Sequence, residues 1–223
     1  PKAGESMPGR LTIELLKNEA KVFAQKESRH KEPIIYGVTD GKAIGTYLEH
    51  KFHLYLAEKY RYKKGSPAKG IDFPDLAVDM KVTSIKQPQS SCPFSSSRQK
   101  VFGLGYGLLI FIYSKSDDGK SSTATLTIQH VIFVEKEHTG DYQMTKAILE
   151  ILANDGNEDD LVAHMEDRFL LLDESASRTL AREILKKPPP QGYITLSNAL
   201  QWRLQYGRAI QKAGTVEGVH RVL

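Results

Sequence analysis

The sequence is poor in the features that build disulfides and membrane spans. Cys92 is the single cysteine, so an intrachain disulfide is impossible and a reducing compartment is favoured. No run of about 18 apolar residues occurs, which predicts no transmembrane helix and no membrane partner. We therefore expect a cytoplasmic protein.

Motifs of several common enzyme classes are missing as well. No Gly-x-Ser-x-Gly sequence is present, which argues against a serine hydrolase. The stretch "GLGYG" at 103–107 lacks the Lys-Ser/Thr ending of a phosphate-binding loop. His50 and His53 fail the spacing that a zinc metalloprotease needs, so we expect both to be polar residues of a surface or interface.

The composition is that of one soluble globular domain. The chain has 223 residues, of which 40% are hydrophobic and 26% are charged. Lys and Arg exceed Asp and Glu by 31 to 27, which gives a net charge of +4. Such a chain can bury a sizeable core, and its mild positive excess permits a polyanionic partner without requiring one.

The apolar pattern predicts a mixed α/β core followed by helices. Apolar residues at helical spacing predict two N-terminal helices, at 11–25 and about 43–61. The continuous apolar run "YGLLIFIYS" and the alternating "ATLTIQHVIFVEKE" predict a central strand and its neighbour. From Asp141 the pattern is helical. The expected C-terminal helices are at about 142–153, 160–169, 175–186 and 197–212.

The stretch "DFPDLAVDMK" at 72–81 predicts an antiparallel hairpin. Pro74 and Asp75 are favoured turn residues. With "PDLA" as the connection, Phe73 pairs with Val78.

This register sets two acids side by side. Asp72 lies opposite Asp79, with their Cβ atoms about 5 Å apart, and Lys81 points to the same face as Asp79. Like charges in facing positions destabilise a sheet, whereas a divalent cation removes the repulsion, and oxygen ligands suit Mg²⁺. A water or phosphate oxygen could be held by Lys81. A solvated hairpin with Lys81 as an ion-pair partner is the structural alternative.

These residues resemble the active-site residues of the PD-(D/E)xK nuclease superfamily. Within that superfamily, they are most similar to the MutH-like group and to restriction enzymes built like MutH. "GTYLE" (45–49) is similar to the helix that supplies an acid in that group, and "DFPDLAVDMKVTS" (72–84) to its catalytic hairpin. The sequence departs from the group in having Asp79 where Glu is usual. The literal Pro-Asp pair is Pro74–Asp75, which the register assigns to the turn.

The resemblance implies a fold, an activity and a set of site residues. It implies a single restriction-endonuclease-like domain over 1–223, with a mixed sheet flanked by helices, a catalytic core at about 40–137 and a helical C-terminal portion at about 140–223. The implied function is a prokaryotic type II restriction endonuclease that cuts double-stranded DNA with Mg²⁺. Asp72, Asp79 and Glu49 would bind the metal, and Lys81 would orient the attacking water.

Two alternatives stay open at this point. One is a MutH-like repair nickase that acts with partner proteins, and the other is a non-catalytic DNA-binding module on a nuclease-like scaffold. A palindromic recognition site would favour a homodimer, although a monomer would also be compatible with this chain length. The recognised DNA sequence and the cut position do not follow from the chain.

Two further segments are candidates for DNA contact. The Ser/Pro/Gln-rich stretch "QPQSSCPFSSSRQK" offers Ser90, Ser91, Arg98 and Lys100, and an ordinary polar loop is its plain alternative. The last predicted helix could follow phosphates with its basic side chains or form a solvated basic face over Trp202. Its candidate residues are Arg203 and Arg208.

Overall fold

The computed structural model describes residues 9–65, 70–91, 96–168, 170, 172–197 and 203–223. These residues form two compact units. The first unit takes its described residues from Pro1–Pro88, Leu109–Phe133 and Arg221–Leu223. The second takes its residues from Gln89–Leu108 and Val134–His220.

The first unit contains both predicted N-terminal helices. Helix α1 spans Ile13–Glu27 and helix α2 spans Gly41–Ala57. Each begins at a side-chain cap: Thr12 accepts a hydrogen bond from the first turn of α1, and Asp40 accepts two from the first turn of α2. The caps place the start of each helix within about two residues of the expected position.

The long strands form a four-stranded sheet in the order β3-β5-β6-β9. Its strands are β3 (Val78–Ser84), β5 (Gly107–Asp118), β6 (Thr123–Val134) and β9 (Val219–Arg221). Every residue of β5 from Gly107 to Tyr113 is buried, as a continuous apolar run predicts for a strand covered on both faces. A two-residue parallel pair, β1 (Gly9–Arg10) with β2 (Tyr60–Arg61), precedes this sheet along the chain.

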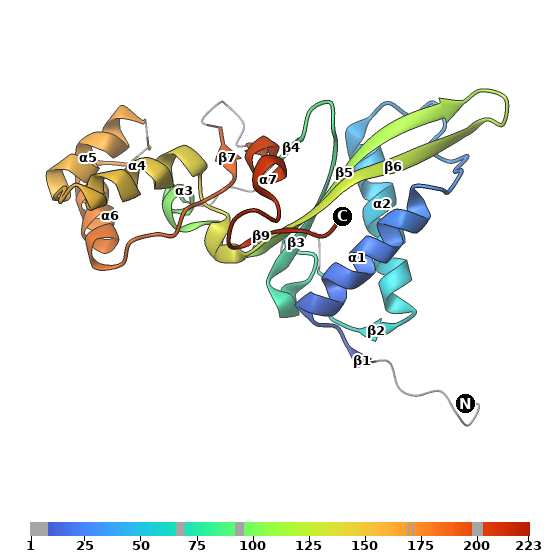
Figure 1. The fold of residues 1–223 in the computed structure, drawn as a ribbon, viewed down its shortest axis with the longest axis horizontal. Helices are drawn as coiled ribbons and strands as arrows, with labels where there is room; N and C mark the ends of the chain where they lie inside the picture. The colour runs from blue at the N-terminus through green and yellow to red at the C-terminus, as the bar shows by residue number, and fades with distance from the viewer. Residues whose placement is uncertain (1–8, 66–69, 92–95, 169, 171, 198–202) are drawn as a thin grey trace. The chain divides into compact units, whose positions relative to one another are not determined.

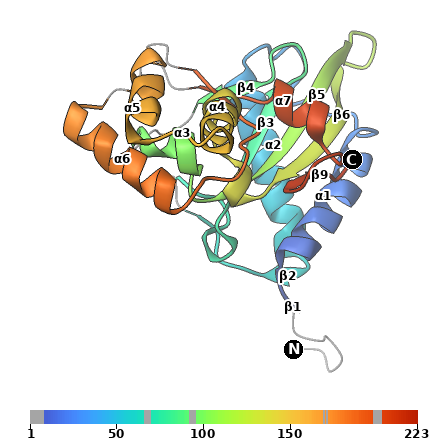
Figure 2. The ribbon, with the colours of Figure 1, turned by 60° about the vertical axis from the view of Figure 1, so that its left-hand side comes forward.

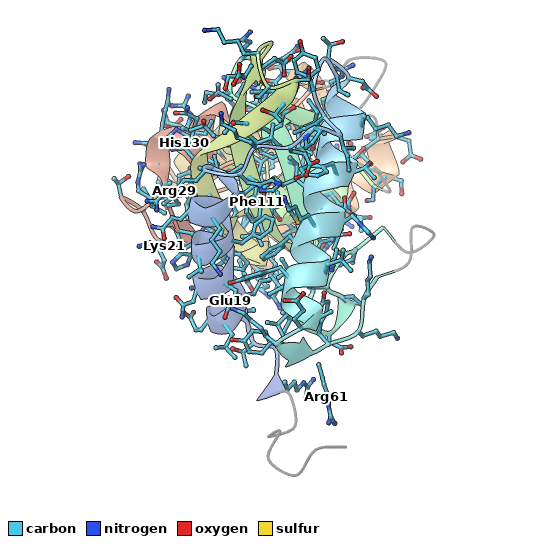
Figure 3. The ribbon with its side chains drawn as sticks, turned by 90° about the vertical axis from the view of Figure 1, so that its right-hand side faces the viewer. Glu19, Lys21, Arg29, Arg61, Phe111 and His130 are labelled. Carbon is cyan, nitrogen blue, oxygen red and sulfur yellow. The ribbon has the colours of Figure 1, made fainter. Side chains whose placement is uncertain are left out.

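Aromatic side chains pack α1 and α2 onto the sheet. Figure 3 shows the two helices side by side in front of the strands, with Phe111 of β5 behind them. The ring centroids of Phe23 and Phe52 are 5.0 Å apart, and Phe111 lies 5.3 Å from Phe52 and 6.2 Å from Phe23. The sheet and the helices that cover it confirm the predicted α/β architecture. This architecture is consistent with a restriction-endonuclease-like core.

The second unit is mainly helical. Helices α4 and α5 contact each other, as do α5 and α6, and the three group together in Figures 1 and 2. They match the predicted C-terminal helices up to residue 186, and their inner faces form a separate apolar core. The helices of this part are α3 (Arg98–Phe102), α4 (Tyr142–Ala153), α5 (Glu158–Asp167), α6 (Glu174–Lys186) and α7 (Gly207–Lys212). The described residues also include two short 3₁₀ turns, η1 (Pro74–Leu76) and η2 (Lys136–His138).

The predicted helix at 197–212 is wrong. Residues Arg203–Gln205 form strand β8, which pairs antiparallel with β4 (Gln89–Ser91) on one side and β7 (Thr195–Leu196) on the other. Within the predicted range, the helical part that the structure shows is the short helix α7, which follows β8. Trp202 lies outside the described residues. Strand β7 is close to β8 in sequence, but β4 is far from it, and helical periodicity within the segment cannot report the pairing with β4.

Among the helices of the described residues, none combines the length and the apolar character that crossing a bilayer requires.

Candidate active site

The hairpin of the first unit has the predicted register. Phe73 and Val78 pair antiparallel and exchange two backbone hydrogen bonds, of 2.9 and 3.2 Å. Between them, η1 makes the turn, and Ala77 closes it in the left-handed region with φ at 50°. The first arm of the hairpin is one bridge long and not a strand, which corrects the expectation of two paired strands. Asp75 is exposed in the turn, where the register had placed it.

The register brings Asp72 and Asp79 together. Asp79 is 2% exposed, whereas Asp72 is half-buried. The two carboxyl groups share a hydrogen bond, which requires a proton on one of them. The backbone N–H of Met80 donates a second hydrogen bond, of 2.8 Å, to Oδ2 of Asp72.

Burial dominates the electrostatics of this pair. It raises the pKa of Asp79 to about 7; the Lys81 charge opposes this rise, and the hydrogen bond that protonated Asp79 donates to Asp72 adds to it. Burial also raises the pKa of Asp72, while the hydrogen bond with Asp79 lowers it, so the shared proton belongs to Asp79. The Nζ atom of Lys81 lies 2.7 Å from Oδ2 of Asp79. Both acids and the lysine therefore lie together, as the sequence predicted.

Helix α2 brings Glu49 to the hairpin. At Gly45, one turn earlier, a Cβ atom would stand 3.9 Å from Val82 of β3, so the helix lies directly against that strand. An alanine would also fit there, so the close approach does not depend on the absence of a side chain. Carboxylate oxygens of Glu49 and Asp72 lie within 4.8 Å of each other.

His53 belongs to this group, whereas the sequence predicted a polar residue of a surface or interface. One of its ring nitrogens lies within 4.8 Å of the ligand oxygens of Glu49 and Asp72. The residue is 3% exposed, so its assignment to the surface was wrong, whereas His50 is exposed. Burial, followed by the charges of Lys64 and His50, lowers the pKa of His53 to about 4, which keeps its ring neutral.

A simple signal could have indicated this histidine. Glu49 and His53 are four residues apart on a helix and therefore share one face. The spacing of His50 and His53 is that of no zinc metalloprotease, but the informative pair on this helix is Glu49 with His53.

The proposed DNA-contacting residues all lie in the second unit. Ser90 is hydrogen-bonded to the Tyr206 hydroxyl, and Ser91 is exposed on β4. Arg98 forms an ion pair with Glu183. Lys100 is only 5% exposed, and burial lowers its pKa. A buried ammonium cannot reach a phosphate without a rearrangement, so Lys100 is the weakest of these candidates.

The two C-terminal arginines differ from each other. Arg203 is exposed on β8, and Arg208 lies over the Tyr142 ring at 4.2 Å and donates a hydrogen bond of 3.2 Å to Gln211. Neither sits on the long helix that the sequence predicted. A role of these six residues in DNA binding stays a prediction.

Comparison with known proteins identifies the family of the chain. A family model described as "Type II restriction enzyme NspV" matches residues 10–221. The curated type II restriction enzyme NspV of a Nostoc species is 61% identical over 209 residues, which cover 94% of this chain and 95% of that enzyme. No solved structure matches. The chain therefore belongs to the type II restriction enzyme NspV family, which confirms the restriction endonuclease expected from its sequence.

Proposed function

We propose that this restriction endonuclease hydrolyses DNA with Mg²⁺ at a site formed by Asp72, Asp79, Glu49 and Lys81. One observation carries the proposal: the buried Asp79 pairs with Asp72 on one side and lies 2.7 Å from Lys81 on the other. A carboxyl that burial keeps protonated, beside a second acid and a lysine, is costly as plain structure and typical of catalytic sites. Family membership favours a restriction endonuclease over the two alternatives.

The donor set fits a divalent cation. Asp72 and Asp79 retain one proton between them in the folded protein, and a cation can replace that proton. Glu49 adds a further oxygen within 4.8 Å of Asp72. When bound, the cation offsets the charge of the carboxylates and polarises the phosphate that is attacked.

The side chains of the chain itself have separate roles in this proposal. Once it has lost its proton, Asp79 would hold the Lys81 ammonium in place as a carboxylate, and its burial would keep water from screening that ion pair. Lys81 orients the attacking water and offsets the negative charge that grows on the phosphate. Glu49 is half-exposed and can accept a hydrogen bond from a water. The water oxygen bonds to phosphorus, and the bond from phosphorus to the 3′ oxygen breaks.

The assignment to the PD-(D/E)xK superfamily, and to its MutH-like group, is part of the proposal. It is supported by the order of a helix acid, a hairpin acid and an Asp-x-Lys strand along the chain. The contacts among these residues in the first unit add to that support.

The DNA substrate leads to proposals for the partner, the oligomeric state and the compartment of the enzyme. Double-stranded DNA is the partner, and a palindromic site favours an enzyme with two active sites related by a twofold axis. We therefore propose a homodimer on DNA. The bacterial cytoplasm is the compartment in which such a substrate would be met.

Plasmid cleavage tests the proposal. With Mg²⁺, the purified protein should convert supercoiled plasmid into linear fragments of fixed length, in the same pattern as the Nostoc enzyme. Removal of the metal with a chelator should stop the reaction, and Asp79→Asn should be inactive, whereas Asp75→Asn should cut normally. Nicked circles as the end product, or cutting by Asp79→Asn at the normal rate, would contradict the proposal.

A further inference from the structure

His53 has one ring nitrogen that hydrogen bonding in the protein leaves unused. Its side chain is 3% exposed and packs against two aromatic rings, with centroid distances of 4.8 Å to Phe73 and 5.9 Å to Tyr62. Nδ1 lies 2.9 Å from the Tyr62 hydroxyl. Nε2 is fully buried, and among the described residues it has no hydrogen-bond partner.

The partners of Tyr62 determine which nitrogen carries the proton. The Tyr62 hydroxyl has one hydrogen and donates it to the backbone oxygen of His53, at 3.0 Å. The hydroxyl must therefore accept the hydrogen bond at Nδ1, which makes Nδ1 the protonated nitrogen. Nε2 then holds a free lone pair in a place that water does not reach.

A buried nitrogen with a free lone pair is costly unless something binds it. An unsatisfied buried acceptor destabilises the fold, because nothing replaces the hydrogen bond that it makes to water in the unfolded chain. Packing alone does not need that nitrogen, because a phenyl ring could fill the same space against the Phe73 and Tyr62 rings. The nearby groups are acidic: a ring nitrogen of His53 is within 4.8 Å of ligand oxygens of both Glu49 and Asp72.

We infer that Nε2 of His53 is a direct ligand of the divalent cation, together with the carboxylates of Glu49 and Asp72. The inference rests on the proposed function, since it concerns the same site. A neutral imidazole with its other nitrogen fixed by a hydrogen bond is the usual form of a metal-binding histidine. Tyr62 is the positioning residue that sets this form.

The nitrogen ligand changes which cations the site prefers. Mg²⁺ prefers oxygen ligands, whereas imidazole favours later transition metals, whose affinity for a mixed site rises from Mn²⁺ through Co²⁺ to Ni²⁺. The site should therefore bind Co²⁺ more tightly than Mn²⁺, and the loss of His53 should weaken both far more than Mg²⁺.

Pulsed electron paramagnetic resonance of bound Mn²⁺ tests the assignment directly. The full-length protein with Mn²⁺ should show the coupling of a ¹⁴N ligand. His53→Gln should lose this coupling and bind Mn²⁺ about tenfold more weakly or worse, with Mg²⁺ affinity changed much less. His50→Gln is the matched control, because it makes the same substitution at an exposed site on the same helix. It should retain both the coupling and the affinity.

The outcomes separate this inference from the proposed function. Bound Mn²⁺ without nitrogen coupling in the unaltered protein, or coupling that persists in folded His53→Gln, overturns the inference while Mg²⁺-dependent cleavage still stands. Absence of both divalent-ion binding and cleavage would overturn the proposed function itself. If circular dichroism shows that His53→Gln does not fold, Tyr62→Phe replaces it. Removal of that Nδ1 partner should weaken Mn²⁺ binding about tenfold, and an unchanged affinity overturns the assignment of Nε2.

Discussion

Replacement of Asp79 by asparagine should abolish cleavage and, without metal, stabilise the fold. The carboxyl is 2% exposed, and burial raises its pKa from 3.8 to about 7. Asparagine has nearly the same shape and carries no charge to bury. The gain in stability should depend on pH, because the unaltered protein loses stability only at pH values where Asp79 is ionised in the unfolded chain.

The sign and size of this change in the free energy of unfolding follow from the pKa values of Asp79 in the unfolded and the folded chain. Below about pH 4 the carboxyl is protonated in both the folded and the unfolded state and makes no difference. From about pH 4 to pH 7 the unfolded chain ionises while the folded chain keeps its proton, so the free energy of unfolding falls by about 1.4 kcal/mol per pH unit. Above about pH 7 the full penalty is reached, on the order of 4 kcal/mol. Stability from this group is therefore lost as the pH rises.

Thermal unfolding in a metal chelator at about pH 5 and about pH 8 measures the effect. The difference in free energy between Asp79→Asn and the unaltered protein should be about 3 kcal/mol larger at the higher pH, or roughly 5–10 °C in Tm for a chain of this length. Comparing two pH values cancels contributions that do not titrate, such as the altered packing of the side chain. Added Mg²⁺ should raise the Tm of the unaltered protein far more than that of the variant.

The exposed turn residue provides the control. Asp75→Asn removes the same charge from η1 and should shift the Tm equally at both pH values. Our account of the buried carboxyl is refuted if Asp79→Asn also shifts the Tm equally at both, because burial would then not hold the proton.

Three further predictions concern the site and the core. Asp72→Asn should stop plasmid cleavage while Asp75→Asn cuts normally; the opposite pattern would make the literal Pro-Asp pair the active acid. Ca²⁺ in place of Mg²⁺ should support specific DNA binding in a gel shift without cleavage, because its longer, flexible ligand geometry aligns the attacking water poorly; cutting in Ca²⁺ at the Mg²⁺ rate would exclude this explanation. Phe52→Ala should lower the free energy of unfolding by about 3–5 kcal/mol in a urea titration. A loss under about 1 kcal/mol would mean that the aromatic packing of α1, α2 and β5 contributes little.

The acid pair and its lysine could be predicted from the sequence because their geometry is local. Asp72 and Asp79 are joined by a short turn, and a turn of given length sets the register of its arms. Lys81 then follows from the alternation of side chains along a strand. The same reasoning gave α1, α2 and α4, whose apolar spacing and capping residues lie within each segment.

The sequence did not predict the arrangements that depend on distant contacts. The segment at Arg203–Gln205 has a helical pattern but forms a strand, because the distant strand β4 supplies backbone partners on one side and the neighbouring β7 on the other. Lys100 looks like a surface residue in a polar stretch and is buried, since its environment comes from elements elsewhere in the chain.

Tertiary structure also decided the composition of the site. By itself, the sequence determined that two acids and a lysine share one face of a hairpin, and only the family resemblance predicted that Glu49 joins them. The packing of α2 on β3 decided that Glu49 and His53 meet Asp72, and Tyr62 decided which nitrogen of His53 is free. The physical reason is that a helix position some twenty residues before the hairpin reaches it only through the docking of the helix on the sheet, and side-chain periodicity does not encode that docking.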